Sequence, residues 1–301
     1  MRHLISIGGG FSSTIELPLA VIEKYGGENV DMVIACLAGE SPDLWKLVKE
    51  CERLTGKSVT RITYSPKRQY LVNAPEVMWW DIWDIFFQQG RMGSSLADPC
   101  SRILKRETLR AYVQNNYYPT DTILHVGITA SEIDRMMAIQ RNWGKKWEKV
   151  HYVGGGEFMI EERPGYRVEA DLADRPAAGT SAQRCKAMLG WVPRLYEWGA
   201  SHNNCAGFCV KAGHAQMARL LWYEPDLYAY HEMQEERFQQ AFDTSATIMR
   251  DRKTVSGVTE STPLSMRAFR ERLNDRWAGM MFPPFDELED TPACSFCDSA
   301  A

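Results

Sequence analysis

The stretch from Ser6 to Thr14, which reads Ser-Ile-Gly-Gly-Gly-Phe-Ser-Ser-Thr, constrains the fold more than any other part of the chain. It follows a short apolar run typical of a buried strand and precedes residues 15–24, whose apolar side chains recur at helical spacing. Glycines allow positive φ angles and a close approach of the backbone to a ligand, and the hydroxyls that follow lie at the positive end of the helix. The pattern is typical of a phosphate-binding loop, and a tight turn without a ligand is the alternative.

The next segments alternate between strand and helix patterns. Residues 31–37 form a continuous apolar run that predicts a strand buried on both faces, residues 43–54 carry a helical pattern after a proline, and residues 58–63 read as a third strand. This alternation predicts an α/β fold with a doubly wound parallel sheet, whose ligand sites lie at the carboxyl ends of strands. The glycine loop and Glu40 both fall at such ends.

Two more polar clusters follow along the chain. Arg102 and Lys105 are three residues apart at the start of a predicted helix, so they share one face and could both reach an anion, although a solvated charge pair is the simpler interpretation. A fourth strand is predicted over residues 122–126, and the turn after it begins at Gly127 and leads to Arg135. These clusters are expected at the same edge of the sheet as the glycine loop.

Two further segments extend this pattern. The aromatic residues 79–87 predict a helix that packs on the sheet, with a base-stacking lid as the alternative. After about residue 145 the alternation ends, and long helices are predicted over residues 228–252 and 264–277. We therefore expect residues 1–150 to form a nucleotide-binding α/β domain and residues 151–301 a mainly helical region that carries cysteine motifs.

Cysteine pairs mark two loops of the second half. The pairs are C-x3-C and C-x2-C, formed by Cys205 and Cys209 and by Cys294 and Cys297. Four such thiolates could hold one zinc ion or an iron–sulfur cluster, and Cys100 or Cys185 could replace one of them. Two alternatives stay open: the last pair belongs to a tail that binds no metal, or the first pair, next to Lys211, presents a reactive thiol of low pKa.

Composition narrows the class of protein. A net charge of −4 gives no global basic field for nonspecific nucleic-acid binding, and no run of about 18 apolar residues predicts a membrane span. The first residues do not resemble a signal peptide, so a cytoplasmic protein with reduced or metal-bound cysteines is expected. Cys36 and Cys51 follow the apolar pattern and are predicted to be small buried hydrophobic residues.

Taken together, these elements resemble the phosphoadenosine phosphosulfate reductase-like branch of the adenine nucleotide α-hydrolase (PP-loop ATP pyrophosphatase) superfamily. The glycine loop is similar to its S-G-G-x-[DST]-S pyrophosphate loop. The other matching elements, in chain order, are Leu37–Pro42, Cys100–Lys105, Gly127–Arg135 and Asn203–Gly213, which resemble T-G-x-E-x-P, C-S-x-x-x-K, G-I-x-x-x-E-x-x-R and N-N-C-x-G-x-C-V-K-A-G. The resemblance covers residues 1 to about 215 in the right order, and implies a Rossmann-like nucleotide-binding fold.

The resemblance also implies roles for single residues. The implied nucleotide-binding residues are Ser6, Gly8, Gly9, Gly10, Ser12, Ser13, Thr14, Glu40 and Gly127. The implied catalytic residues are Lys105, Arg102, Arg135, Cys205 and Cys209, of which the cations neutralise phosphate charge. Two departures from the motif stand out: Gly8 replaces the first serine, and Ser12 stands where many ATP-cleaving members carry aspartate. The E-C-G-x-H cysteine context of true sulfonucleotide reductases is absent from the sequence.

Three functions follow from the resemblance. The first is an ATP pyrophosphatase-type enzyme that uses Mg²⁺ and adenylylates an acceptor, a small molecule or a nucleic acid, for sulfur or nitrogen transfer. The second is a thiol-dependent reductase of adenylyl sulfate or its 3'-phosphorylated form, served by a thioredoxin-like reductant. The third is a nucleotide-binding protein without catalysis, which the serine at position 12 favours. A sulfur donor is a further expected partner, and a membrane is not.

Overall fold

A six-stranded sheet lies at the centre of the computed structural model, which describes residues 1–94, 97–154, 157–175, 178–200, 203–255 and 258–288. The strand order is β4-β3-β2-β1-β5-β8, and all neighbours are parallel except β4 and β3. The strands are β1 (Arg2–Ile7), β2 (Val30–Cys36), β3 (Val59–Ser65), β4 (Gln69–Val72), β5 (Thr122–His125) and β8 (Arg167–Glu169). The predicted α/β class with a mostly parallel sheet is confirmed, and the arrangement is compatible with a Rossmann-like fold.

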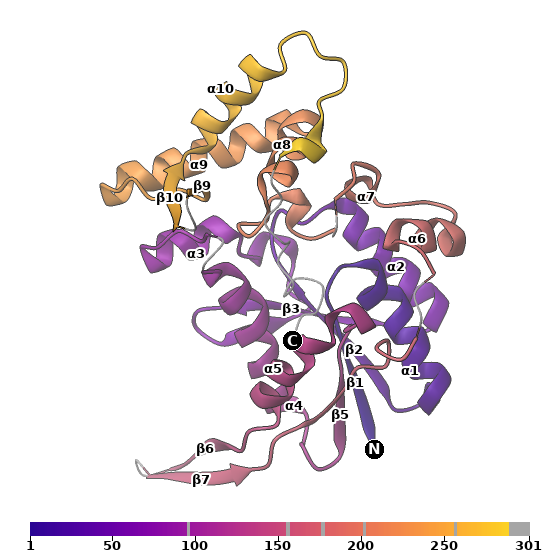
Figure 1. Cartoon of the computed structure of the whole chain (residues 1–301). Helices are drawn as coiled ribbons and strands as arrows, with labels where there is room; N and C mark the ends of the chain where they lie inside the picture. Colours follow the sequence, from indigo (N-terminus) through magenta and orange to yellow (C-terminus); the bar gives the residue numbers. More distant parts are fainter. Residues whose placement is uncertain (95–96, 155–156, 176–177, 201–202, 256–257, 289–301) are drawn as a thin grey trace.

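Helices cover both faces of this sheet (Figure 1). Ile5 and Ile7 of β1 pack with α1 (Leu17–Tyr25) and α2 (Pro42–Thr55). Leu4, on the opposite face of the same strand, packs with α4 (Thr108–Asn116) and α5 (Ile133–Trp143). Because both faces are covered, β1 and β2 are buried along nearly their whole length, and the apolar run of β2 is continuous, as predicted.

The connections reverse direction next to β1. The chain runs outward from β1 to β2 and β3, then returns to place β5 and β8 on the other side of β1. In open parallel sheets, such a reversal leaves a crevice at the carboxyl ends of the two strands, where ligands bind. The glycine loop follows β1 and the Gly127 turn follows β5, so both border this crevice.

Two motif-bearing helices begin with a wide π-helical turn. One turn covers Ser12–Glu16 and leads into α1, and the other covers Ser101–Glu107 and leads into α4. Short π-helical segments are rare and occur often at functional sites. The helices predicted after the glycine loop and after Cys100 are thus confirmed, with a first turn that the sequence did not predict.

The aromatic segment forms part of the second core. Trp83 and Phe86 of α3 (Ile82–Gln89) are almost fully buried and pack with α8 (His214–Tyr223), α9 (Pro225–Phe242) and α10 (Met266–Arg276). A helix is confirmed here, but its buried aromatic residues pack with other helices and not on a face of the sheet as predicted, and this burial leaves no role as a lid for the two side chains. Figure 1 shows these helices together beyond one end of the sheet.

The second half contains more strand than predicted. It adds the hairpins β6 (Trp147–Gly154) with β7 (Glu157–Arg163) and β9 (Met249–Val255) with β10 (Val258–Leu264), besides α6 (Ser181–Leu189) and α7 (Arg194–Glu197). The β6–β7 hairpin projects from the body of the molecule (Figure 1). The helix predicted over residues 228–252 ends at Phe242, because Asp243 takes a left-handed conformation with φ 46° and stops it.

Short 3-10 turns complete the described structure, at Glu76–Met78, Ala130–Glu132, Cys205–Gly207 and Phe285–Glu287. Among the helices of the described ranges, none combines the length and the apolar character that a membrane span requires.

Candidate functional site

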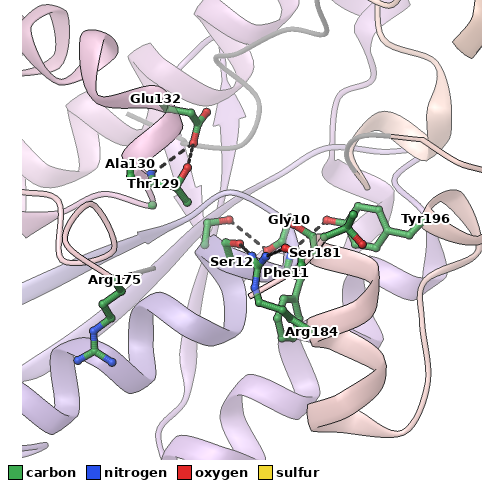
Figure 2. A pocket seen from close by; sticks show the side chains of 14 residues that line it. Gly10, Phe11, Ser12, Thr129, Ala130, Glu132, Arg175, Ser181, Arg184 and Tyr196 are labelled. Carbon is green, nitrogen blue, oxygen red and sulfur yellow. Dashed lines mark hydrogen bonds between the residues drawn. The ribbon is translucent and has the colours of Figure 1, made fainter. Parts of the chain in front are cut away.

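A cavity of about 420 Å³ opens where the chain reverses, at the carboxyl ends of β1 and β5. Three parts of the chain form its wall: the glycine loop, the turn after β5, and residues of the second half at Arg175, at 179–184 and at Tyr196. The lining residues are Gly10, Phe11, Ser12, Ser13, Gly127, Thr129, Ala130, Glu132, Arg175, Gly179, Thr180, Ser181, Arg184 and Tyr196. Figure 2 shows the labelled side chains around this space, which we call the crossover cavity.

The glycine loop is held by its own hydrogen bonds. The Gly8 N–H donates to Ser13 Oγ at 3.3 Å, and that hydroxyl donates to the Gly10 carbonyl at 3.2 Å. Gly9 has a φ of 88°, and a Cβ added to it would lie 2.7 Å from Asn204 Oδ1 and 2.9 Å from Leu44 Cδ1. The loop therefore needs glycine at position 9 for its backbone angle and for its close contacts.

The predicted nucleotide-binding residues divide into two groups. Gly10, Ser12, Ser13 and Gly127 line the crossover cavity. The others, Ser6, Gly8, Gly9, Thr14 and Glu40, do not line it, and the side chains of Ser6 and Thr14 are buried. Within the described part of the chain, Thr14 Oγ1 is a buried hydroxyl without a hydrogen-bond partner.

Arg184 of α6 binds the glycine-loop helix. Its Nη2 donates to Ser12 Oγ at 2.9 Å and to Glu16 Oε2 at 3.0 Å, and its Nε donates to Glu16 Oε1 at 2.7 Å. A further bond from Nη1 to the Gly179 carbonyl measures 2.6 Å. Arg184 thus lies next to the Ser12 hydroxyl at the cavity wall (Figure 2) and joins it to Glu16.

Two other residues from the second half reach the same cavity. The Phe11 N–H donates to the Tyr196 hydroxyl at 3.1 Å, and Arg175 pairs with Glu23 at 2.7 Å. The sequence analysis missed Arg175, Arg184 and Tyr196. No motif or spacing ties these residues to the glycine loop, because the contacts arise from a chain path more than 150 residues long.

The turn after β5 is closed by a capping box. Thr129 and Glu132 exchange side-chain and backbone hydrogen bonds at the start of the helix. Arg135 forms an ion pair with Glu132, which itself lines the cavity. The predicted cation at position 135 is therefore engaged with an acid of the cavity wall and does not line the cavity itself.

Glu40, Lys105 and Cys205 meet at the end of β2, one strand away from the crossover cavity. Glu40 Oε1 accepts Lys105 Nζ at 3.2 Å, and Glu40 Oε2 accepts the Cys205 N–H at 2.6 Å. Both charged side chains are almost fully buried. Three predicted elements are thus brought together, but Lys105 contacts a carboxylate and does not line the crossover cavity. Arg102 is half exposed and pairs with Glu107 at 2.7 Å.

Of the two cysteines of the first motif, Cys209 is buried and Cys205 is half-buried. Cys100, Cys205 and Cys209 line one small cavity together with Lys105. Burial raises the pKa of the Cys205 thiol well above its usual range and that of Cys100 to about 12, the opposite of a reactive thiol of low pKa. Cys205 and Cys209 belong to no compact set of three metal ligands within the described ranges. Cys294 and Cys297 lie outside the described residues.

The remaining cysteines are packing residues. Cys36 and Cys51 are almost fully buried among the apolar side chains of β2, α1 and α2, as predicted. Burial raises the pKa of each of these thiols to about 12. Cys185 is buried in the same core, away from Cys205.

A buried polar cluster lies between α1 and the sheet. His3 Nδ1 is 2.9 Å from His125 Nε2, and His125 Nδ1 is 2.5 Å from Asp171 Oδ2. Lys24 Nζ donates to Asp171 at 2.9 Å and to Glu169 at 3.1 Å. Burial raises the pKa of Asp171, but the bonds from His125 and Lys24 outweigh it and hold the pKa at about 2.

This cluster contains the one set of three compact potential metal ligands that the described residues offer, His125, Glu169 and Asp171. Lys24 already supplies a cation to both carboxylates. We therefore interpret the cluster as an internal ion-pair network that fastens α1 to β5 and β8. The sequence analysis did not identify it, because its members are far apart in the chain.

In comparisons with known proteins, no family model and no curated protein matches the sequence.

Proposed function

We propose that this protein binds an adenine nucleotide in the crossover cavity and cleaves ATP between the α and β phosphates to adenylylate an acceptor. The observation that carries the proposal is the position of the cavity: the glycine loop and the Gly127 turn border it at the reversal point of a mostly parallel sheet. This is where open α/β sheets bind nucleotides. The resemblance to the PP-loop superfamily supports the proposal.

The phosphates would lie at the glycine loop. Ser12 and Ser13 open the helix that leads into α1, and the first amides of a helix favour anions. The adenosine would then extend toward Gly127 on the opposite wall. Ser12, Ser13 and Gly127 all line the crossover cavity. Its volume of about 420 Å³ falls in the range of small-molecule sites.

Charge compensation would come from residues that the motifs did not predict. Arg184 and Arg175 line the cavity and each pairs with one glutamate. A triphosphate is a stronger partner for a guanidinium than one carboxylate. Arg184, which already donates to Ser12 Oγ, would therefore bind the phosphate chain and stabilise the charge on the leaving pyrophosphate.

Magnesium requires oxygen ligands, and one carboxylate lies in the cavity wall and another beside it. Glu132 lines the cavity, and Glu16 lies on the glycine-loop helix, joined to Ser12 through Arg184. Glu16 and Glu132 would hold the ion, which would neutralise phosphate charge. Glu16 thus places an acid close to the position where the superfamily loop carries aspartate, which weighs against a protein without catalysis.

In the proposed reaction, an oxygen of the acceptor attacks the α phosphorus. The bond between that phosphorus and the α–β bridging oxygen breaks, pyrophosphate leaves, and the acceptor oxygen loses its proton. The adenylylated acceptor then becomes the substrate for sulfur or nitrogen transfer. The raised pKa of Cys205 weighs against the thiol-dependent reductase, whose first step needs a thiolate.

We also propose Cys205 and Cys209 as ligands of a zinc ion or an iron–sulfur cluster. The two thiols share a cavity with Cys100 but do not form a compact set of three ligands. The described residues therefore do not complete such a site, and no step of the reaction is assigned to it. Metal and labile sulfide analysis of the anaerobically purified full chain measures this directly.

Pyrophosphate release from ATP tests the proposed function. We expect release that depends on Mg²⁺ and on an acceptor, with strong loss in Arg184→Ala. Arg53→Ala is the matched control, because Arg53 is an exposed arginine of α2 that pairs with Glu50 away from the cavity. Intact ATP binding with no pyrophosphate release across candidate acceptors would contradict the proposal.

A further inference from the structure

A second cavity, of about 200 Å³, lies at the carboxyl end of β2. Its wall comes from residues 37–40, from the start of α3, from the turn at 205–208 and from α9. None of these segments lines the crossover cavity. We call it the β2 cavity.

Two consecutive residues, Asn204 and Cys205, contact the glycine loop and the β2 cavity. Cys205 lines the β2 cavity and is bonded to Glu40 through its N–H. Asn204, the preceding residue, approaches the glycine loop so closely that a Cβ at Gly9 would meet it at 2.7 Å. Because β1 and β2 are parallel neighbours, both cavities open at the same edge of the sheet. The β2 cavity is thus placed next to the phosphate end of the proposed nucleotide site.

The floor of the β2 cavity is aromatic. Phe208 and His231 are both buried and stack on each other, with ring centroids 3.6 Å apart and planes 6° from parallel. His231 Nδ1 accepts a hydrogen bond from Trp83 Nε1 at 2.9 Å. Burial lowers the pKa of His231 to about 3, so the ring is neutral and its hydrogen lies on Nε2, which is a donor.

The mouth of the β2 cavity is acidic. Asp81 accepts the Tyr230 hydroxyl at 3.0 Å and the Asp84 N–H at 2.8 Å. Both are hydrogen bonds from neutral groups, so they leave the charge of Asp81 in place. The charge of Glu40 is balanced by Lys105. A ligand that fits must therefore donate hydrogen bonds or carry positive charge at the mouth.

We propose that the β2 cavity binds a small heteroaromatic ring that carries an amino group. The ring would pack against the apolar side chains of the wall, Leu37, Ile82 and Leu227, and its nitrogen would accept from the edge of His231 at Nε2, while the amino group would donate to Asp81. The inference that a ring binds here depends only on the residues of the β2 cavity. Its assignment as the part of the acceptor that reaches the nucleotide rests on the proposed function.

The acidic mouth also indicates the source of the ring. A nucleic acid would bring phosphates next to Asp81, and like charges at short distance repel. The net charge of −4 adds to this repulsion. The geometry therefore favours a free small molecule over a base within a nucleic acid.

Binding of 2-aminopyridine, followed by ligand-observed NMR and calorimetry on the full chain, tests this inference. Pyridine lacks the amino group and cyclohexylamine lacks the flat ring, so both are expected to bind at least about tenfold more weakly. A short single-stranded oligonucleotide is the competing probe. Equal binding of cyclohexylamine, or binding of the oligonucleotide alone, would overturn the assignment.

Two variants locate the binding. Leu227→Trp places a larger side chain in the cavity wall and should abolish binding, whereas Met233→Trp, at an exposed position of the same helix outside the cavity, should not. Asp81→Asn keeps a residue that caps α3 well but removes the charge, and should weaken binding about tenfold. Unchanged affinity for 2-aminopyridine in both Leu227→Trp and Asp81→Asn would overturn the inference.

The ATP affinity of the same variants separates the two proposals. Melting followed by circular dichroism shows whether each variant is folded. A folded Leu227→Trp protein that binds ATP normally and no longer binds 2-aminopyridine supports the β2 cavity as a separate site. A wild-type protein that binds 2-aminopyridine but not ATP contradicts the proposed function and leaves the ring site standing.

Discussion

Arg184 Nη2 lies 2.9 Å from Ser12 Oγ, although the two residues are 172 positions apart in the chain. The contact joins α6 to the first turn after the glycine loop, and the same guanidinium binds Glu16 on that turn. Ser12 and Arg184 line the crossover cavity, and Glu16 lies beside it. Arg184, from the second half of the chain, therefore forms part of the cavity wall next to the predicted phosphate loop.

Replacement of Arg184 tests whether its guanidinium binds phosphate. Arg184→Ala should weaken ATP binding by about 10- to 100-fold, the range expected for loss of a charge-assisted contact. Arg184→Lys should recover part of the affinity, since it keeps the charge but not the bidentate geometry. Calorimetric titration of ATP measures both, with Arg53→Ala as the control. Unchanged affinity in Arg184→Ala would place the phosphates elsewhere.

Replacement of Gly9 tests the shape of the loop. Gly9→Ala forces a left-handed angle on alanine and brings its Cβ to 2.7 Å from Asn204 Oδ1 and 2.9 Å from Leu44. We expect a loss of about 2–4 kcal/mol in the free energy of unfolding, measured in urea.

Gly56→Ala is the matched control, because Gly56 has a left-handed φ of 67° with nothing within 4 Å of an added Cβ. Its expected loss is about 1 kcal/mol, from the backbone angle alone. Equal losses in the two variants would show that the contact with Asn204 does not constrain the loop.

Glu235 makes the stability of the C-terminal helices depend on pH. Its buried carboxyl group accepts the N–H groups of Ile248 and Met266 at 2.9 and 2.7 Å, and burial raises its pKa to about 7 despite these bonds. The unfolded chain loses this proton near pH 4.5 and the folded chain only near pH 7. Between these values the folded state binds more protons, so its stability falls as the pH rises, by at most about 3 kcal/mol.

Urea unfolding of Glu235→Gln from pH 4.5 to 7 measures this contribution. The variant should lose the part of the pH dependence that belongs to Glu235, because glutamine does not titrate. Glu236→Gln, at the neighbouring and more exposed position, is the control. An identical pH profile in wild type and Glu235→Gln would contradict the assignment.

The ion-pair network under α1 should contribute to stability and not to nucleotide binding. Asp171→Asn removes the charge that pairs with Lys24 and His125 in the protein interior. We expect a loss of about 2–4 kcal/mol in the free energy of unfolding, with ATP affinity preserved when the protein is folded. Exposed Asp134→Asn serves as the control. A stability equal to wild type would show that the network is not needed to hold α1.

The parts of the fold that the sequence predicted are those with a local signal. Apolar runs predicted the buried strands β1 and β2, and apolar residues at helical spacing predicted the helices beside them. Glycine and proline residues marked where these elements begin and end. The hairpins β6–β7 and β9–β10 were missed because they are exposed and carry many charges, so neither has the apolar alternation of a half-buried strand.

The site was predicted in part for the same reason. Ser12, Ser13 and Gly127 lie in local motifs at strand ends, and the structure places them around one cavity. That Lys105 pairs with Glu40, and that Arg184 reaches Ser12, depends on how distant segments pack, which spacing in a sequence does not encode.

A crystal structure of the protein with Mg²⁺ and a non-hydrolysable α,β-methylene analogue of ATP tests the central claim most directly. We expect the triphosphate at Ser12 and Ser13, with the guanidinium of Arg184 turned from Glu16 toward it, and the adenosine beside Gly127. A nucleotide bound outside the crossover cavity, or no detectable binding in solution at a nucleotide concentration of about 1 mM, would contradict it.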